Sequence, residues 1–412
     1  MTRSPRPTHD AFYTSGPVPS DPGVPVRHRR VSLPTTVGIK AWQVVHSTIG
    51  TTGRPVAVSG TILVPEMPWP VGPRPVVSFG VGVHGLHRDA APSHLLREGR
   101  ESELPLIELA LRRGWAVAVT DGEGLGMPGP HTYGAGGVGG RAMLDVVRAA
   151  REAPVGLDRS APVALWGYSE GGRCAVFAAE QHSTYAPDVP LVAVAAGGVP
   201  ADLRAVAKAI DGGPFSGLNL AVLVGLATAH ERPELWEILT DAGKEVARRA
   251  AGLDVVGLVL GHPEPLATHT TRGAPWDEPH WHALLASERA GRRSPEVPTY
   301  LYHAEHDEIV PTALTRDLAR RYRRRDAQVR LVTVSAPDHL SGADAGAAGA
   351  LAWLAEHLVQ PGTGGGGTEV SAPPRLNDER QEGSDDHRPD RAADRRLGGP
   401  AQERVGPRRL RG

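Results

Sequence analysis

The segment Gly167-Tyr168-Ser169-Glu170-Gly171 restricts the possible folds of this chain more than any other feature. It follows an apolar, strand-like run and precedes a helix-like run. In a G-x-S-x-G turn between a strand and a helix, the serine occupies a tight, strained conformation. The residues two before and two after it must then be small, because larger side chains would collide. The following helix directs its first N–H groups and its dipole at the serine. We therefore predict that Ser169 is a nucleophile on such a turn.

Strand-like and helix-like segments alternate on both sides of this turn. We predict strands at residues 40–46, 56–64, 75–81, 115–120, 162–166, 191–195, 298–303 and 329–334. We predict helices at residues 103–113, 140–152, 171–181, 312–324 and 343–357. This alternation is typical of a mainly parallel sheet flanked by helices, which is the α/β class. With the serine turn, it predicts the α/β-hydrolase fold.

One long interval, residues 201–293, interrupts the alternation. It contains no clear strand but several helix-like pieces, including residues 233–251. We interpret it as a helical cap inserted over the open end of the sheet. Its apolar run at residues 218–227 fits two roles, an acyl-pocket lining or the cap's own core, and the second role requires no ligand.

The two ends of the chain differ from the rest in composition. Residues 1–35 are rich in Pro, Arg and Ser and are predicted to form an extended arm. Residues 361–412 have almost no large apolar side chains, so they are predicted to be a disordered tail. We expect residues 36–360 to form the hydrolase domain with its cap.

The formal net charge of −1 lacks the basic excess of a nucleic-acid-binding protein. The longest apolar stretch, residues 218–229, is shorter than the ~20 residues of a membrane span.

The single cysteine, Cys174, excludes an intrachain disulfide and is interpreted as a core residue. The first residues lack the apolar segment of a secretory signal, so we expect a cytoplasmic protein, or a secreted one if the start codon is mis-assigned. The oligomeric state stays open.

A nucleophilic serine needs a base, and the base needs a third group to hold it. In the predicted fold, the acid follows a later strand and the histidine follows the last one. Asp307 lies after the strand at residues 298–303, beside the competing carboxylates Glu305 and Glu308; its D-x-x-V-P spacing favours Asp307. His339 follows the last predicted strand. The order Ser169, Asp307, His339 predicts a catalytic triad.

Two backbone N–H groups are expected to form an oxyanion hole. One belongs to Glu170, the residue after the nucleophile. The other lies in the loop after the strand at residues 75–81, where Val83 and His84 are both candidates.

Three motifs offer competing interpretations. Residues 80–85 and 134–139 both spell G-x-G-x-x-G, but neither has the strand before it and the helix after it that a dinucleotide site needs. His280 and His282, near Asp277 and Glu278, match no standard catalytic zinc spacing. We therefore predict neither a cofactor nor a metal ion.

The chain also resembles the secretory lipase family, the group that contains fungal lipase A. The resemblance covers about residues 60–357. It rests on Ala91-Pro-Ser93, Asp121-Gly-Glu-Gly-Leu-Gly126, Gly167-Tyr-Ser-Glu-Gly-Gly172, Tyr185-Ala-Pro187, Gly212-Gly-Pro-Phe215, His303-Ala-Glu-His-Asp-Glu-Ile-Val-Pro311 and Asp338-His-Leu340. The resemblance implies a capped α/β-hydrolase that cleaves acylglycerols or simpler carboxylic esters without a cofactor. It places the triad on Ser169, Asp307 and His339.

Two positions depart from the family. Ala90 replaces the cysteine that usually precedes Ala-Pro-Ser, and Glu170 stands where Gln or Gly is common. The first departure agrees with a reducing compartment, which has no use for a disulfide. Three alternative functions stay open: an acyltransferase, an amidase or peptidase on the same fold, and an inactive binding protein.

Overall fold

The computed structural model describes residues 4–358, and its central element is a nine-stranded sheet. The strand order is β1-β2-β3-β5-β4-β6-β7-β8-β9. The bounds are β1 Pro25–Val31, β2 Ile39–Ile49, β3 Pro55–Pro65, β4 Val76–Gly80, β5 Ala116–Thr120, β6 Val163–Tyr168, β7 Leu191–Gly197, β8 Thr299–Ala304 and β9 Val329–Val334. Strands β1, β2, β3 and β5 pair antiparallel, and the pairs from β5 to β9 are all parallel.

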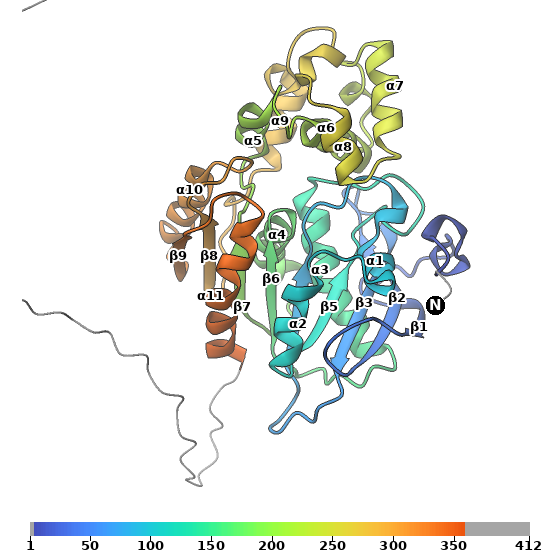
Figure 1. The fold of residues 1–412 in the computed structure, drawn as a ribbon, viewed down its shortest axis with the longest axis vertical. Coiled ribbons are helices and arrows are strands. Elements are labelled where there is room, and N and C mark those ends of the chain that lie inside the picture. The colour runs from blue at the N-terminus through green and yellow to red at the C-terminus, as the bar shows by residue number, and fades with distance from the viewer. Residues whose placement is uncertain (1–3, 359–412) are drawn as a thin grey trace, which may run out of the picture. The chain divides into compact units, whose positions relative to one another are not determined.

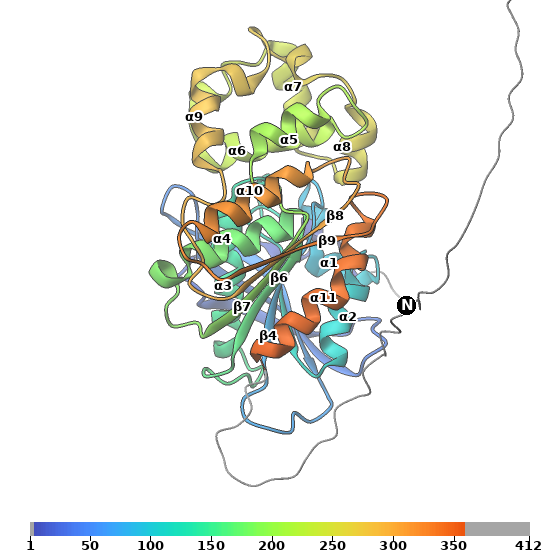
Figure 2. The same cartoon turned by 90° about the vertical axis from the view of Figure 1, so that its left-hand side faces the viewer.

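Helices cover both faces of this sheet (Figures 1 and 2). One face packs on α3 (Gly136–Glu152), α4 (Glu170–Tyr185) and α10 (Thr312–Arg323), and the other on α1 (Pro92–Glu98), α2 (Leu104–Arg112) and α11 (Ser341–Leu358). Strand β6 shows why both faces are apolar. Val163 and Leu165 point into the first core, while Ala164 and Trp166 point into the second. Successive side chains of a strand face opposite sides, so a central strand covered on both faces is apolar throughout.

The segment predicted as a cap consists of helices that lie above one end of the sheet (Figure 1). They are α5 Leu203–Ile210, α6 Gly217–His230, η4 Pro233–Leu235, α7 Asp241–Ala250, α8 Val255–Gly261, η5 Leu266–His269, η6 Pro275–Asp277 and α9 Pro279–Ser287. Many of these helices meet in one hydrophobic cluster, to which α6 contributes Leu220, Leu223 and Leu226, and which also includes Leu86 and Val138 from outside the cap. Among the described helices, none has the length and hydrophobicity that a bilayer crossing requires.

Three local features differ from the predictions. Part of the predicted arm is an edge strand, because β1 pairs with β2, and Arg29 forms an ion pair with Asp10. Helix α1 was not predicted, yet Pro92 fits its first turn, where no N–H is needed. The helix predicted at 233–251 is divided into η4 and α7, because Thr240 caps the start of α7 by accepting from the N–H of Gly243. The tail predicted at 361–412 lies outside the described residues.

Candidate active site

Ser169 lies on a strained turn between β6 and α4. Its φ of 55° is positive, which is rare for a residue with a side chain. The glycines of the motif let three backbone segments touch. A Cβ atom on Gly171 would lie 1.9 Å from the carbonyl oxygen of Gly80, and one on Gly167 would lie 2.4 Å from the carbonyl carbon of Gly171. The residues around the serine must therefore be small because neighbouring backbone atoms occupy the space that a Cβ atom would need.

The structure brings Ser169, His339 and Asp307 together, although they are far apart in the sequence. The imidazole Nε2 of His339 lies 2.9 Å from the Oγ of Ser169. Its Nδ1 lies 2.7 Å from the Oδ2 of Asp307. Each residue follows the carboxyl end of a parallel strand (β6, β8 and β9), and these ends meet at one edge of the sheet. A carboxylate can only accept, so Nδ1 donates to Asp307, and Nε2 is left to accept from the serine hydroxyl.

Asp307 is held in place by its own loop. Its Oδ1 accepts from the backbone N–H groups of Ile309, at 3.0 Å, and Val310, at 2.7 Å. Its Oδ2 also lies 3.0 Å from the Nε2 of His303. Burial alone would raise the pKa of Asp307, but the hydrogen bonds from His303, His339 and Val310 hold it well below the usual range. This carboxyl group therefore stays ionised at any ordinary pH.

The two competing carboxylates have other positions. The Oε2 of Glu308 accepts from the backbone N–H of His339 at 2.8 Å, so it fixes the loop that carries the imidazole. Glu305 is exposed to solvent. Of the three candidates, only the side chain of Asp307 contacts the imidazole.

The loop after β4 is fixed by two acidic residues that the sequence analysis did not identify. Glu103 accepts from the N–H of Gly82 at 2.7 Å, which removes that N–H from the oxyanion donors. The ring of His84 bonds through Nδ1 to the carbonyl oxygen of Gly82 and through Nε2 to Glu101, both at 2.8 Å. Burial would lower the pKa of His84, but Glu101 and Glu103 raise it to about 9. Val83 and His84 both line the cavity that contains Ser169, so both stay candidates for the second donor.

The cavity above Ser169 has a volume of about 640 Å³ and is lined mainly by apolar residues of the cap. They include Val206, Phe215, Leu218, Leu223, Val259 and Trp281. Ser169 and His339 line the same cavity, together with Glu103 and Asp344. The apolar run on α6 therefore lines this cavity with Leu218 and Leu223, and Leu223 also belongs to the hydrophobic cluster of the cap.

The remaining motifs have packing explanations. Gly80 begins the first G-x-G-x-x-G and packs against Gly171 of the serine turn. In the second, Gly136 begins α3, where a Cβ would lie 2.4 Å from the ring of Phe177 on α4. His280 and His282 are exposed on α9, and the carboxylates near them pair with arginines instead: Asp277 with Arg204 and Glu278 with Arg272.

Glu170 follows the nucleophile, but its carboxyl group is buried behind the turn. Its Oε1 accepts from the N–H of Gly134 at 3.3 Å, and its Oε2 has no hydrogen-bond partner within residues 4–358. Burial raises the pKa of Glu170 to about 7. The ionised form is therefore poorly stabilised in the folded protein.

Glu170→Gln should change how stability depends on pH. The unfolded pKa is near 4.5 and the folded pKa is about 7, so the folded state holds more protons between these values. The free energy of unfolding therefore falls as pH rises through this window. The variant lacks this titration and should gain on the order of 1–3 kcal/mol over wild type between pH 5 and pH 8. Urea unfolding of both proteins at both pH values measures the gain.

Other buried carboxyl groups, such as Asp121, have pKa values raised in the same direction. They titrate in both proteins, so the difference between the two isolates Glu170. A difference in stability that stays constant from pH 5 to pH 8 would show that Glu170 does not titrate in this window.

Comparison with known proteins gives the family. The sequence model described as secretory lipase matches residues 92–272 and 277–365. A protein of Mycobacterium tuberculosis named as a probable inactive lipase is 28% identical over 380 residues, covering 86% of this chain and 82% of the relative. A secreted triacylglycerol lipase of Malassezia globosa is 28% identical over 378 residues, covering 85% and 81%. The expected cytoplasmic location finds no support in these relatives.

The crystal structure of Candida antarctica lipase A in its closed state is similar to this one. The TM-score is 0.77 at 24% sequence identity, with 87% of each chain covered. This similarity, with the mostly parallel sheet and its flanking helices, confirms the predicted α/β-hydrolase fold. The family match spans more than half of the sequence, and it also confirms the resemblance noted from the motifs. The chain belongs to the secretory lipase family.

Proposed function

We propose that this protein is a serine carboxylic-ester hydrolase, a lipase or esterase, with Ser169 as its nucleophile. The observation that carries the proposal is the chain of hydrogen bonds from Asp307 through His339 to Ser169, which ends in an apolar cavity. Membership of the secretory lipase family supports hydrolysis of ester bonds.

In the proposed mechanism, Ser169 Oγ attacks the ester carbonyl carbon while Nε2 of His339 takes its proton. Asp307 holds the imidazole in the required tautomer and stabilises the imidazolium. The N–H of Glu170, with that of Val83 or His84, binds the oxyanion, and each donor contributes ~3–4 kcal/mol. His339 then returns the proton to the leaving alcohol, and an acyl-enzyme forms. Water, activated by the same imidazole, releases the acid and restores Ser169.

The cavity supports an acyl chain as the group that the site receives. Its volume of about 640 Å³ lies within the range of ligand pockets. The cap supplies aliphatic and aromatic walls, and Ser169 and His339 line the same cavity. Acylglycerols and simpler esters both fit this description. The Malassezia globosa relative is named a secreted triacylglycerol lipase, which favours acylglycerols and an extracellular location.

One relative, named as a probable inactive lipase, makes a binding protein the second candidate. In the present chain, hydrogen bonds connect Ser169, His339 and Asp307, which favours an active enzyme. An acyltransferase or an amidase would use the same three residues. An acyltransferase passes the acyl group to an alcohol instead of water, and an amidase releases an amine instead of an alcohol.

The test is a series of p-nitrophenyl esters from acetate to palmitate, a triglyceride emulsion and a matched p-nitroanilide. We expect ester hydrolysis, a preference for acyl chains longer than acetyl, and much slower anilide cleavage. Equal cleavage of ester and anilide would indicate an amidase, and preferential transfer to glycerol in water would indicate an acyltransferase. If no ester is cleaved and a fluorophosphonate does not label the protein, it is a binding protein.

A further inference from the structure

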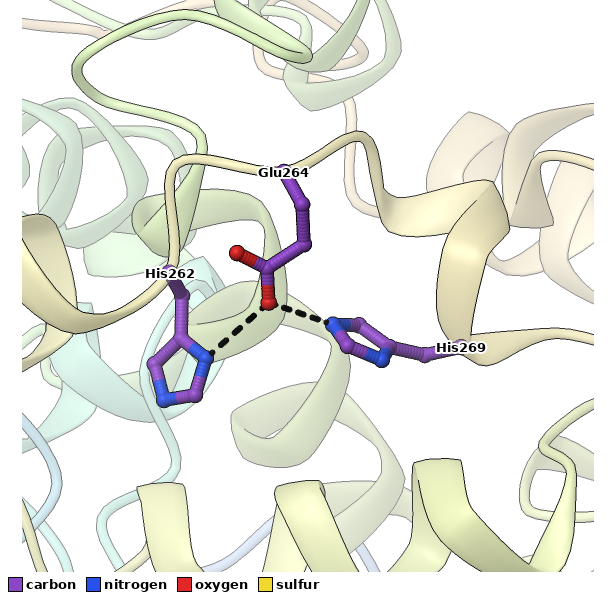
Figure 3. Close-up of side chains that lie close together, drawn as sticks. All are labelled: His262, Glu264 and His269. Carbon is purple, nitrogen blue, oxygen red and sulfur yellow. Dashed lines mark hydrogen bonds and ion pairs between the residues drawn. The ribbon is translucent and has the colours of Figure 1, made fainter.

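We propose that His262, Glu264 and His269 of the cap bind a divalent transition-metal ion of the zinc type. The three side chains converge between α8 and η5, as Figure 3 shows. The Nδ1 of His262 lies 3.4 Å from the Oε1 of Glu264, and the Nε2 of His269 lies 2.9 Å from the same oxygen. All three ligand atoms lie within 4.8 Å of one another.

The donor set and its dimensions are those of a zinc site. Two imidazole nitrogens and one carboxylate oxygen are common zinc ligands, with bonds of about 2.0–2.1 Å. In a tetrahedron with such bonds, ligand atoms are separated by roughly 3.3 Å. The two separations from Glu264 Oε1 are 3.4 and 2.9 Å, so small side-chain movements would admit an ion among the three atoms. The fourth position would be open to water.

The backbone holds these ligands in place. Glu264 lies between Pro263 and Pro265, whose rings fix φ on both sides of it. Its carbonyl oxygen accepts from the hydroxyl of Ser216 at 2.7 Å. The carbonyl oxygen of His269 accepts from the N–H of Thr240 at 3.0 Å. The site therefore exists before an ion binds, and less conformational entropy is lost on binding.

Burial and charge also fit a cation. The side chains of His262, Glu264 and His269 are 16%, 32% and 11% exposed, which shields them but leaves a path for an ion. Within residues 4–358, the ion pairs of Glu264 are with His262 and His269, and no lysine or arginine pairs with it. The simpler alternative is that both imidazoles donate hydrogen bonds to this carboxylate. A bound ion would take the place of the protons on Nδ1 of His262 and Nε2 of His269.

A bound ion would connect the end of α8 to η5. Val255 and Val259 of α8 and Leu266 of η5 all line the cavity above Ser169. The ion would therefore fix one wall of the cavity, so we expect it to raise the temperature of thermal unfolding. This inference does not depend on the proposed ester hydrolysis.

The test uses full-length protein that has been treated with a chelator and then titrated with Zn²⁺ by calorimetry. We expect one ion per chain and a higher unfolding temperature in its presence. Co²⁺ in place of Zn²⁺ should give the visible absorption of a four-coordinate site. Glu264→Gln and His269→Gln should each weaken Zn²⁺ binding by at least about tenfold.

Two variants serve as matched controls. His280→Gln with His282→Gln removes two exposed histidines of the same cap, and His339→Gln removes the histidine beside Ser169. Both should keep the cap site. The proposal is wrong if wild type binds no Zn²⁺, or if Glu264→Gln binds it as tightly as wild type. It is equally wrong if His339→Gln abolishes binding, because the ion would then lie beside Ser169.

Discussion

Ser169→Ala is expected to lower kcat for p-nitrophenyl butyrate by a factor on the order of 10⁴–10⁶. The variant removes the hydroxyl that lies 2.9 Å from Nε2 of His339, so no acyl-enzyme can form. Oxyanion donors and substrate binding would supply the remaining rate. Alanine, like serine, has to adopt the φ of 55°, so the fold and its unfolding temperature should change little. Initial rates with circular dichroism and thermal unfolding measure both effects.

Ser78→Ala is the matched control. Ser78 is a buried serine of β4, the strand that pairs with β6, and its hydroxyl donates to the carbonyl oxygen of Met143 at 2.7 Å. Its loss should cost about 1 kcal/mol of stability and leave kcat nearly unchanged. If Ser169→Ala keeps more than a few per cent of wild-type turnover, or if both variants lose activity equally, Ser169 is not the nucleophile.

The sheet could be predicted because local patterns and global topology agree in this chain. Each central strand is a short apolar run followed by glycine or a polar turn, which indicates a strand covered on both faces. All eight predicted strands have counterparts in the structure, with ends shifted by a few residues. The predicted triad residues could be placed for the same reason. Each follows a strand, and parallel strands present their carboxyl ends at one edge. Their catalytic roles stay predictions.

Features that depend on contacts distant in the sequence were missed. Strand β1 contains arginines at positions 27, 29 and 30, so its sequence does not look like a strand. Its pairing with β2 and the ion pair between Arg29 and Asp10 are visible only in the structure. The bond from Gly82 to Glu103 spans 21 residues and follows no motif. The histidines considered as metal ligands show a second limit, which is local. His280 and His282 are two apart on a helix, where side chains do not face each other. His262, Glu264 and His269 meet because the chain turns between α8 and η5.

Asp307→Asn is expected to lower kcat by about 10⁴-fold with little change in KM. The asparagine carbonyl can still accept from Ile309 and Val310, so the loop should keep its conformation. Its amide group then replaces the oxygen that lies 2.7 Å from Nδ1 of His339. An amide N–H donates, so Nδ1 must become an acceptor and the proton moves to Nε2. In that tautomer His339 cannot take the proton of Ser169. Steady-state kinetics on one ester measure kcat and KM.

Glu308→Gln separates this effect on the tautomer from a general loss of negative charge beside the imidazole. The Oε2 of Glu308 accepts from the backbone N–H of His339, and a glutamine carbonyl can accept the same hydrogen bond. This variant removes one charge, as Asp307→Asn does, and kcat should stay within about tenfold of wild type because the imidazole keeps its tautomer. If Glu308→Gln is the more damaging of the two, Glu308 rather than Asp307 supports the base. Equal losses would mean that charge, and not the tautomer, controls the rate.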